Sequence, residues 1–243
     1  MNFDLSDDHA LLQRTVRDFA EQEVAPVAAE LDRTKAFPYD LVHKLGQLNL
    51  MGIPFPEEYG GAGADTLAYA IAVEELTRVD SSVAITLCAH TSLGTQPIYL
   101  FGTEEQKQRW LPDLCAGRKL GAFGLTEPEA GSDAGNTKTR ARLEGGEWVI
   151  DGAKQFITNA GTDISGLVSI TAVTGGDGNG AREISNLVVE HGTPGYEQGE
   201  PYRKMGWHAS DTRPLTFTEA RVPEANLLGP RGAGFKQFLH ILD

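Results

Sequence analysis

The sequence predicts an α+β multidomain protein with an all-α N-terminal part, a strand-rich middle part and the beginning of a C-terminal helical part. Three observations predict this order. The first 120 residues hold 8 of the 28 glycines, and the other 20 follow. Apolar residues recur at helical spacing in the first part and form short runs between turn residues in the second. A new helical pattern then begins at Gly232. We therefore expect domains at residues 1–120, 121–231 and 232–243.

Helix signals fill the N-terminal part. Ser6 is suited to cap a helix that begins near Asp7, because a serine side chain accepts a hydrogen bond from the first helical turn. Pro38 suits the first turn of another helix. Residues 82–100 are nearly all apolar or small, which predicts a buried helix. Residues 103–106, Thr-Glu-Glu-Gln, form a capping box that predicts the start of the next helix.

Strand signals follow residue 120. The pair Gly145 and Gly146 predicts a turn between two strands. No long helical pattern separates the apolar runs, which favours a small barrel or sandwich over a parallel sheet. The expected strands are 120–125, 137–143, 147–151, 167–173, 184–189 and 215–222.

The last residues form an apolar helical stripe with nothing after it to pack against. Phe235, Phe238, Leu239 and Leu242 follow i, i+3, i+4, i+7 spacing. Asp243 would place a negative charge at the negative end of the helix dipole, and no Gly or Asn cap follows it. We therefore expect a longer natural chain, in which this helix enters a third, helical domain.

Composition excludes several classes of protein. The net charge of −13 argues against nucleic acid as a general partner, because phosphate backbones need a basic surface. No apolar run approaches the length of a membrane span, and the acidic N-terminus does not resemble a targeting signal. Cys88 and Cys115 fit no metal site. The expectation is a cytoplasmic protein without membrane insertion.

The segment 124–133, Gly-Leu-Thr-Glu-Pro-Glu-Ala-Gly-Ser-Asp, is the most informative part of the chain. Small residues such as Gly131 let a backbone approach a ligand closely, and the hydroxyls of Thr126 and Ser132 can donate or accept hydrogen bonds. Most such turns are only turns. The segment is neither a dinucleotide fingerprint nor a Walker loop.

A second segment, 154–159, carries Phe156 and Thr158 two positions apart, so on a strand both would point to one face. Together with the first segment it favours a planar ligand with polar edges, without identifying that ligand. Three other polar residues favour ordinary roles. We expect His90 to be a packed, hydrogen-bonded histidine, His208 to be a surface loop residue rather than part of a ligand cleft, and Cys88 to lie in the core.

The order and spacing of these motifs resemble the acyl-CoA dehydrogenase family from residue 6 to residue 243. The chain departs from the family signature at Asn136, where relatives usually carry a small residue. The motifs are PEEYGG at 56–61, the segment 124–133, FITN at 156–159, MGW at 205–207, SDT at 210–212, VP at 222–223, NLLG at 226–229 and G-x-G-F at 232–235.

The resemblance implies a helical N-terminal domain, an antiparallel β-barrel middle domain and a C-terminal helical bundle, with FAD in the cleft between the last two. In this family Thr126 would bond the pyrimidine edge of the flavin, Phe156 would pack on the ring, and Thr158 would lie near N5. The cofactor-binding residues implied by the resemblance are Phe123, Leu125, Thr126, Gly131, Ser132, Phe156, Ile157 and Thr158.

The resemblance also implies a reaction, the α,β-dehydrogenation of acyl-CoA thioesters with hydride transfer from Cβ to flavin N5. The family's catalytic glutamate would lie beyond residue 243, so we assign no catalytic base in this chain. Ser132 and Asp243 would contact the substrate, and Glu127 would be structural. Alternatives within the fold are a flavin oxidase, a flavin monooxygenase or a non-catalytic remnant.

The resemblance also implies a role in fatty acid metabolism by β-oxidation. It implies electron-transfer flavoprotein as the electron acceptor and a homotetramer when the protein is full length.

Overall fold

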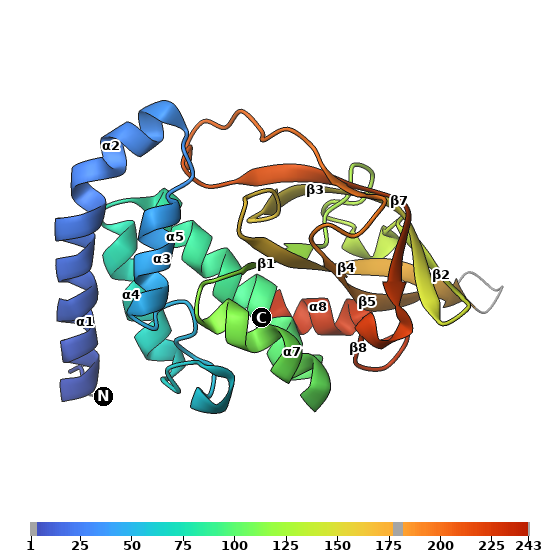
Figure 1. The fold of residues 1–243 in the computed structure, drawn as a ribbon, viewed down its shortest axis with the longest axis horizontal. Helices are drawn as coiled ribbons and strands as arrows, with labels where there is room; N and C mark the ends of the chain where they lie inside the picture. The colour runs from blue at the N-terminus through green and yellow to red at the C-terminus, as the bar shows by residue number, and fades with distance from the viewer. Residues whose placement is uncertain (1–3, 177–181, 243) are drawn as a thin grey trace.

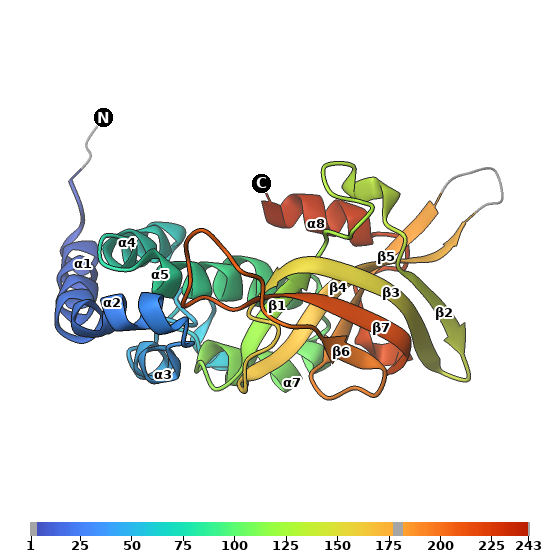
Figure 2. The same cartoon turned by 90° about the horizontal axis from the view of Figure 1, so that it is seen from above.

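The structure is a computed structural model that describes residues 4–176 and 182–242, with helices at one end and a sheet at the other (Figures 1 and 2). The change from helix to strand falls between Cys115 and Leu120. The helices are α1 (Asp7–Phe19), α2 (Ala25–Thr34), α3 (Tyr39–Gln47), α4 (Thr66–Thr77), α5 (Ser81–Cys88), α6 (Gln96–Phe101), α7 (Glu104–Cys115) and α8 (Gly234–Leu242).

Capping side chains fix several helix starts. The Ser6 side chain accepts a hydrogen bond from the backbone N–H of His9 at 3.2 Å, so the predicted cap of α1 is confirmed. The predicted capping box is confirmed at α7, where the side chain of Thr103 and that of Gln106 each accept a hydrogen bond from the other's backbone N–H. The helix expected over 82–100 is a continuous helical run, because a π-helical segment, Ala89–Thr95, joins α5 to α6.

Eight strands in the described part of the chain form one sheet. Its path is β6-β7-β3-β2-β4-β5-β8, and β1 pairs with β4 beside this path. The strands are β1 (Leu120–Gly124), β2 (Arg140–Glu144), β3 (Glu147–Thr158), β4 (Ser165–Gly176), β5 (Arg182–Glu190), β6 (Tyr196–Gln198), β7 (Thr212–Pro223) and β8 (Leu227–Leu228).

The sheet differs from the expected antiparallel barrel in two ways. Among the described strands, β6 and β8 lie at the two ends of the path and do not pair with each other, so closure into a barrel is not confirmed. The sheet is also mixed, because β1 and β2 both run parallel to β4. The reason is the way the chain enters from α7: the Leu120 N–H bonds the carbonyl of Ile164 at 2.8 Å, so β1 starts beside the start of β4.

The strands β1 and β2 share one edge of β4. The first pairs with β4 from Ser165 to Ile170, and the second meets it only at Val173, opposite Arg140. The chain leaves the sheet between the two strands, and this excursion contains the segment 125–137. The topology therefore places the most informative part of the sequence at an interruption in the sheet.

Close backbone packing joins the helices to the sheet. A Cβ added to Gly94 would lie 2.2 Å from the carbonyl carbon of Gly121, so only glycine allows the π-helical segment to meet β1. At the other end of the chain, Gly234 of α8 rests on β5 in the same way, because an added Cβ would lie 2.3 Å from the Ser185 carbonyl carbon. Of the predicted apolar stripe of α8, the Phe238 side chain is buried, whereas Leu239 and Leu242 are exposed.

Candidate functional site

A buried ion pair fills the interruption between β1 and β2. Lys154 of β3 lies 2.7 Å from Glu127, and both side chains are almost wholly buried. The Lys154 ammonium also donates to the Thr171 hydroxyl at 3.0 Å and to the Leu125 carbonyl at 3.3 Å. The Glu127 carboxylate accepts hydrogen bonds from the Thr137 hydroxyl and from the backbone N–H groups of Lys138 and Thr139, just before β2. The pair thus ties both ends of the segment 125–137 to the sheet.

The surroundings of this pair favour its ionised form. Burial by itself raises the pKa of Glu127, but the charge of Lys154 and the hydrogen bonds from Lys154, Thr137 and Thr139 outweigh it and lower that pKa to about 2. Burial lowers the pKa of Lys154, and Glu127 opposes this shift. The expected structural role of Glu127 fits this geometry, because its carboxylate is fully engaged inside the protein.

A β-bulge turns the side chain of Phe156 outward. The register between β3 and β7 shifts between Lys154 and Ile157, and Phe156 has a left-handed φ of 62°. The Phe156 ring is 58 % exposed and contacts the Tyr202 ring at a centroid distance of 5.0 Å. A left-handed φ is costly for an aromatic residue, so the surrounding structure must hold it in place.

The two predicted hydroxyl-bearing edges lie on adjacent segments. The Gln155 N–H donates to the Thr126 carbonyl at 2.9 Å, which brings Thr126 beside the bulge that precedes Thr158. Both threonines are half-buried. Neither hydroxyl has a hydrogen-bond partner within residues 4–176 and 182–242. These donors are therefore available to a ligand.

The other residues expected at the flavin occupy different environments. Ser132 and Gly131 are exposed, and nothing lies within 4 Å of a Cβ added to Gly131. Phe123 is half-buried and stacks on Phe238 of α8 with a centroid distance of 4.0 Å. The side chain of Ile157 points into the core and is only 2 % exposed, which leaves its backbone alone for contact with a ligand. Leu125 is half-buried, and Asp243 lies outside the described residues.

Two site residues were missed by sequence reasoning. Lys154 received no role as the first residue of the segment 154–159. A lysine in an apolar strand, 27 positions after an acidic residue in a glycine-rich turn, nevertheless indicates that the two pair. Tyr202 precedes a basic pair and gave no periodic signal, since it lies in a loop. Its position against Phe156 depends on the bulge, which a local pattern does not reveal.

The two histidines take the ordinary roles that the sequence favoured. His90 is fully buried, its Nε2 bonds the Leu114 carbonyl at 3.0 Å, and its Nδ1 accepts from the Gly121 N–H at 3.1 Å. Burial lowers the pKa of His90 to about 4, so the ring is neutral and links α7 to β1. His208 lies in a loop, where Nδ1 is 2.7 Å from the Asp32 carboxylate.

Two other kinds of feature are absent from the described residues. No group of three or more His, Cys, Asp or Glu side chains in that part of the chain could hold a metal ion. Within the same residues, no helix combines the length and the hydropathy that a bilayer crossing requires.

Two family models match successive parts of the chain. Residues 6–118 match the N-terminal domain of acyl-CoA dehydrogenases, and residues 122–220 match their middle domain. The chain belongs to the acyl-CoA dehydrogenase family. A probable acyl-CoA dehydrogenase, YngJ, from Bacillus subtilis is 50 % identical over 243 residues, which cover 100 % of this chain and 63 % of the relative. A short-chain specific acyl-CoA dehydrogenase from Clostridium acetobutylicum is 46 % identical, with 100 % and 63 % covered.

Solved structures of family members superpose closely. Butyryl-CoA dehydrogenase from Megasphaera elsdenii matches with a TM-score of 0.94 and 41 % identity, covering 100 % of this chain and 63 % of that one. A chain from a study of the electron transferring flavoprotein of Acidaminococcus fermentans matches with a TM-score of 0.95 and 43 % identity, with the same coverage. An acyl-CoA dehydrogenase complexed with FAD, from Bacillus anthracis, matches with a TM-score of 0.90 and 39 % identity, covering 98 % and 40 %. The chain thus spans about three fifths of the curated relatives' length.

Proposed function

We propose that this chain supplies the flavin-binding and thioester-binding surface of an FAD-dependent acyl-CoA dehydrogenase that oxidises the Cα–Cβ bond of acyl-CoA. The observation that carries the proposal is the free polar edge of the sheet, where the unpaired hydroxyls of Thr126 and Thr158 flank the exposed Phe156 ring. An aromatic ring between two hydroxyls suits a planar ligand that is apolar on its face and polar at its rim.

The residues present fit the flavin. Phe156 offers a ring face, the two threonine hydroxyls can donate to polar atoms at the rim of the isoalloxazine, and exposed Gly131 and Ser132 leave their backbone open to an anionic group. Leu125, Phe123 and the backbone of Ile157 complete the proposed contacts. When bound, FAD supplies the hydride acceptor for the reaction.

The protein's own part in this reaction is to bind and orient the flavin and the thioester and to exclude water from them. Lys154 fixes the Leu125 carbonyl, and the Gln155–Thr126 hydrogen bond fixes the next residue, so the hydroxyl of Thr126 is pre-positioned. The base that removes the α-proton is proposed to lie in sequence beyond residue 243. Ser132 is proposed to contact the thioester, and so is Asp243.

For the whole protein we propose the arrangement that the family suggests. Its domains would be 1–120, 121–231 and a helical domain that begins at 232, with the middle domain closing as a β-barrel. We propose an electron-transfer flavoprotein as acceptor, a homotetramer, a role in fatty acid β-oxidation and a cytoplasmic location. The likeness to a chain from the Acidaminococcus study supports the acceptor.

Anaerobic titration of the native protein with butyryl-CoA tests the function. We expect a yellow protein whose flavin absorbance is bleached by the thioester and returns when electron-transfer flavoprotein is added. A colourless native protein that takes up no FAD would refute the proposal. Rapid reoxidation by oxygen alone would instead indicate an oxidase or a monooxygenase, and stable flavin without bleaching would indicate a non-catalytic remnant.

A further inference from the structure

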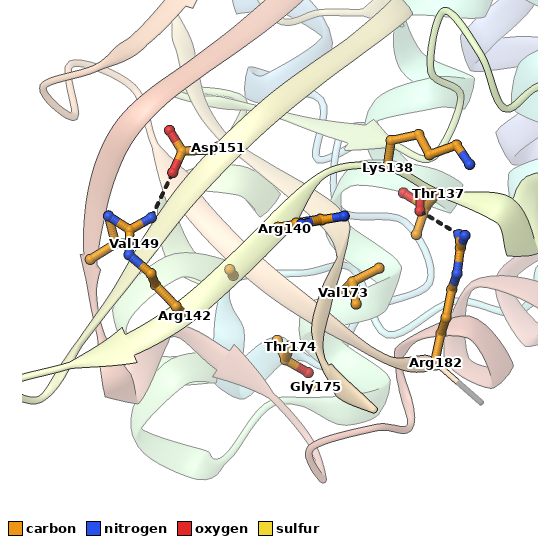
Figure 3. A pocket seen from close by; sticks show the side chains of 11 residues that line it. Thr137, Lys138, Arg140, Arg142, Val149, Asp151, Val173, Thr174, Gly175 and Arg182 are labelled. Carbon is orange, nitrogen blue, oxygen red and sulfur yellow. Dashed lines mark hydrogen bonds and ion pairs between the residues drawn. The ribbon is translucent and has the colours of Figure 1, made fainter. Parts of the chain in front are cut away.

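A cavity opens between the helical part of the chain and the loop that precedes β7. It has a volume of about 430 Å³ and is lined by residues 35, 37 and 39 of the helical part and by residues 162, 201–204, 208–211 and 213. The volume falls within the range of small-molecule sites. The cavity shares no lining residue with the one between β2 and β4, which adjoins the proposed thioester-binding segment at Thr137 and in which Arg142 is turned toward Asp151 (Figure 3).

Cations outnumber carboxylates around this cavity, which we call the α2–β7 cavity. Its lining has one carboxylate, that of Asp211, and the basic residues are Lys35, Arg203, Lys204, His208 and Arg213. Arg213 pairs with Asp211 at 2.6 Å, and His208 pairs with Asp32 at 2.7 Å. Within residues 4–176 and 182–242, neither the Lys35 side chain nor that of Arg203 has a hydrogen-bond or ion-pair partner.

Lys204 gives the strongest indication of a ligand. Its half-buried side chain donates to the Ser210 carbonyl at 2.5 Å and to the Thr212 hydroxyl at 2.9 Å. Both acceptors are neutral, and burial lowers the pKa of Lys204, although the charge of Asp211 opposes this shift. An ammonium has three donors, so the described residues leave one of them for a ligand. An anion in the cavity would offset the cost of partly burying this charge.

Ordinary roles account for the other two unpaired cations only one at a time. Lys35 is the C-cap of α2, where the negative end of the helix dipole favours a cation. Arg203 is exposed, as most arginines are. Neither explanation applies to Lys204. No carboxylate of the described residues pairs with it, in a chain that has 34 acidic residues against 21 Lys and Arg.

We propose that the α2–β7 cavity binds a small oxyanion that carries at least two negative charges. Three cations without a carboxylate partner need more than one negative charge to compensate them. A guanidinium presents donors in a planar fork that matches carboxylate and phosphate oxygens, and an ammonium adds a point charge. A recessed cluster of like charges concentrates the field that attracts an anion. Phosphate esters and polycarboxylates share this chemistry.

A ligand in the α2–β7 cavity would lie against the loop that supports Phe156. Tyr202 lines the cavity, and its ring contacts the Phe156 ring at a centroid distance of 5.0 Å. The same loop is joined to α2 by the pair of His208 with Asp32. Binding would therefore restrain the position of Tyr202. Only this consequence rests on the proposed function, because the anion site itself requires neither flavin nor turnover.

Isothermal titration of the native protein at low salt, with pyrophosphate, citrate and acetate as probes, tests the site. We expect saturable binding of pyrophosphate or citrate, and weaker binding of acetate because it carries a single charge. Arg203→Gln should weaken binding roughly tenfold or more, because hydrogen bonds to a charged group are lost. Added salt should weaken binding too. The matched control Arg118→Gln, which breaks an exposed ion pair outside the cavity, should leave affinity unchanged.

Four results would overturn the site: no saturable binding of pyrophosphate or citrate, acetate binding of equal strength, affinity that Arg203→Gln does not change, or an equal loss in Arg118→Gln. Should Arg203→Gln fold poorly by circular dichroism, Lys35→Gln provides the same test from the helical part. Preference for pyrophosphate indicates a phosphate ester as the natural ligand, and preference for citrate indicates a polycarboxylate. A native protein without flavin would refute the dehydrogenase while leaving the titration interpretable.

Discussion

Two groups of side chains, each drawn from the segment 125–137 and from β3, are used in opposite ways. The Glu127–Lys154 pair is buried and has partners on every side, all of them inside the protein. The edge formed by Thr126, Phe156 and Thr158 leaves two hydroxyls unpartnered and holds an aromatic ring in solvent at a strained φ. The satisfied group stabilises the fold, and the unsatisfied group is available for a ligand.

The difference follows from the β-bulge. On a regular strand, Lys154, Phe156 and Thr158 would share one face, because side chains alternate. The register shift separates them, so Lys154 points inward to the buried pair while Phe156 turns out. One extra residue therefore supplies an anchor and a binding surface from the same short segment.

Lys154→Met should have the largest effect, since it leaves the Glu127 carboxylate buried without its counter-ion. We expect a loss of about 3–5 kcal/mol in the free energy of unfolding, measured by urea denaturation. The matched control is Lys44→Met, which breaks surface pairs with Glu23 and Asp40 and should cost less than about 1 kcal/mol. Equal losses in the two variants would show that the buried pair has no special role.

A double variant distinguishes the cost of an unpaired buried charge from the cost of lost hydrogen bonds in Lys154→Met. Glu127→Gln combined with Lys154→Met keeps an acceptor for the Lys138 N–H but removes both charges. It should therefore recover part of the stability lost in Lys154→Met. A further loss would mean that the attraction between the charges, rather than the cost of one buried charge, dominates.

Acid should destabilise the contact between α7 and β1 through His90. Its pKa is lowered by burial to about 4 in the folded state, below the usual value near 6.5. Protonation therefore favours the unfolded chain: this stabilising contribution is complete above pH 6.5 and is lost as the pH falls toward 4. The loss is up to about 3 kcal/mol.

The His90 ring itself can be followed by NMR. Its carbon-bound protons should not titrate above about pH 5, because burial lowers the pKa of the ring to about 4. A His90 titration midpoint near 6.5 would contradict the buried, neutral ring. Urea denaturation at several pH values gives the matching stability curve.

The sequence predicted most of the local structure, and long-range pairing decided the rest. The caps at Ser6 and Thr103 and the turn at Gly145 depend on neighbouring residues, so their signals are local. The parallel pairing of β1 with β4 joins residues more than 40 positions apart, and no pattern within either strand encodes it. The Lys154–Glu127 pair joins residues 27 positions apart, and the only local sign of it is a lysine within an apolar strand.

Removing the Thr158 hydroxyl should weaken flavin binding more than it lowers the stability of the fold. Thr158→Val keeps the shape of the side chain but removes its donor, so we expect FAD to dissociate roughly tenfold more readily from the native protein. Thr77→Val, on α4, removes a hydroxyl that bonds the Val73 carbonyl and should leave flavin affinity unchanged. Flavin fluorescence on dilution measures both, and equal affinity in both variants would remove Thr158 from the site.

The smallest expected effect tests whether the backbone of Phe156 is strained. Phe156 has a φ of 62°, where only glycine is unstrained, so Phe156→Gly should be more stable than Phe156→Ala by about 1 kcal/mol. At Leu11, an exposed position in α1, the order should reverse, because glycine in a helix costs about 1 kcal/mol relative to alanine. Urea denaturation of the four variants measures both differences. If alanine were the better residue at both positions, the bulge would store no strain, and the outward position of Phe156 would need another explanation.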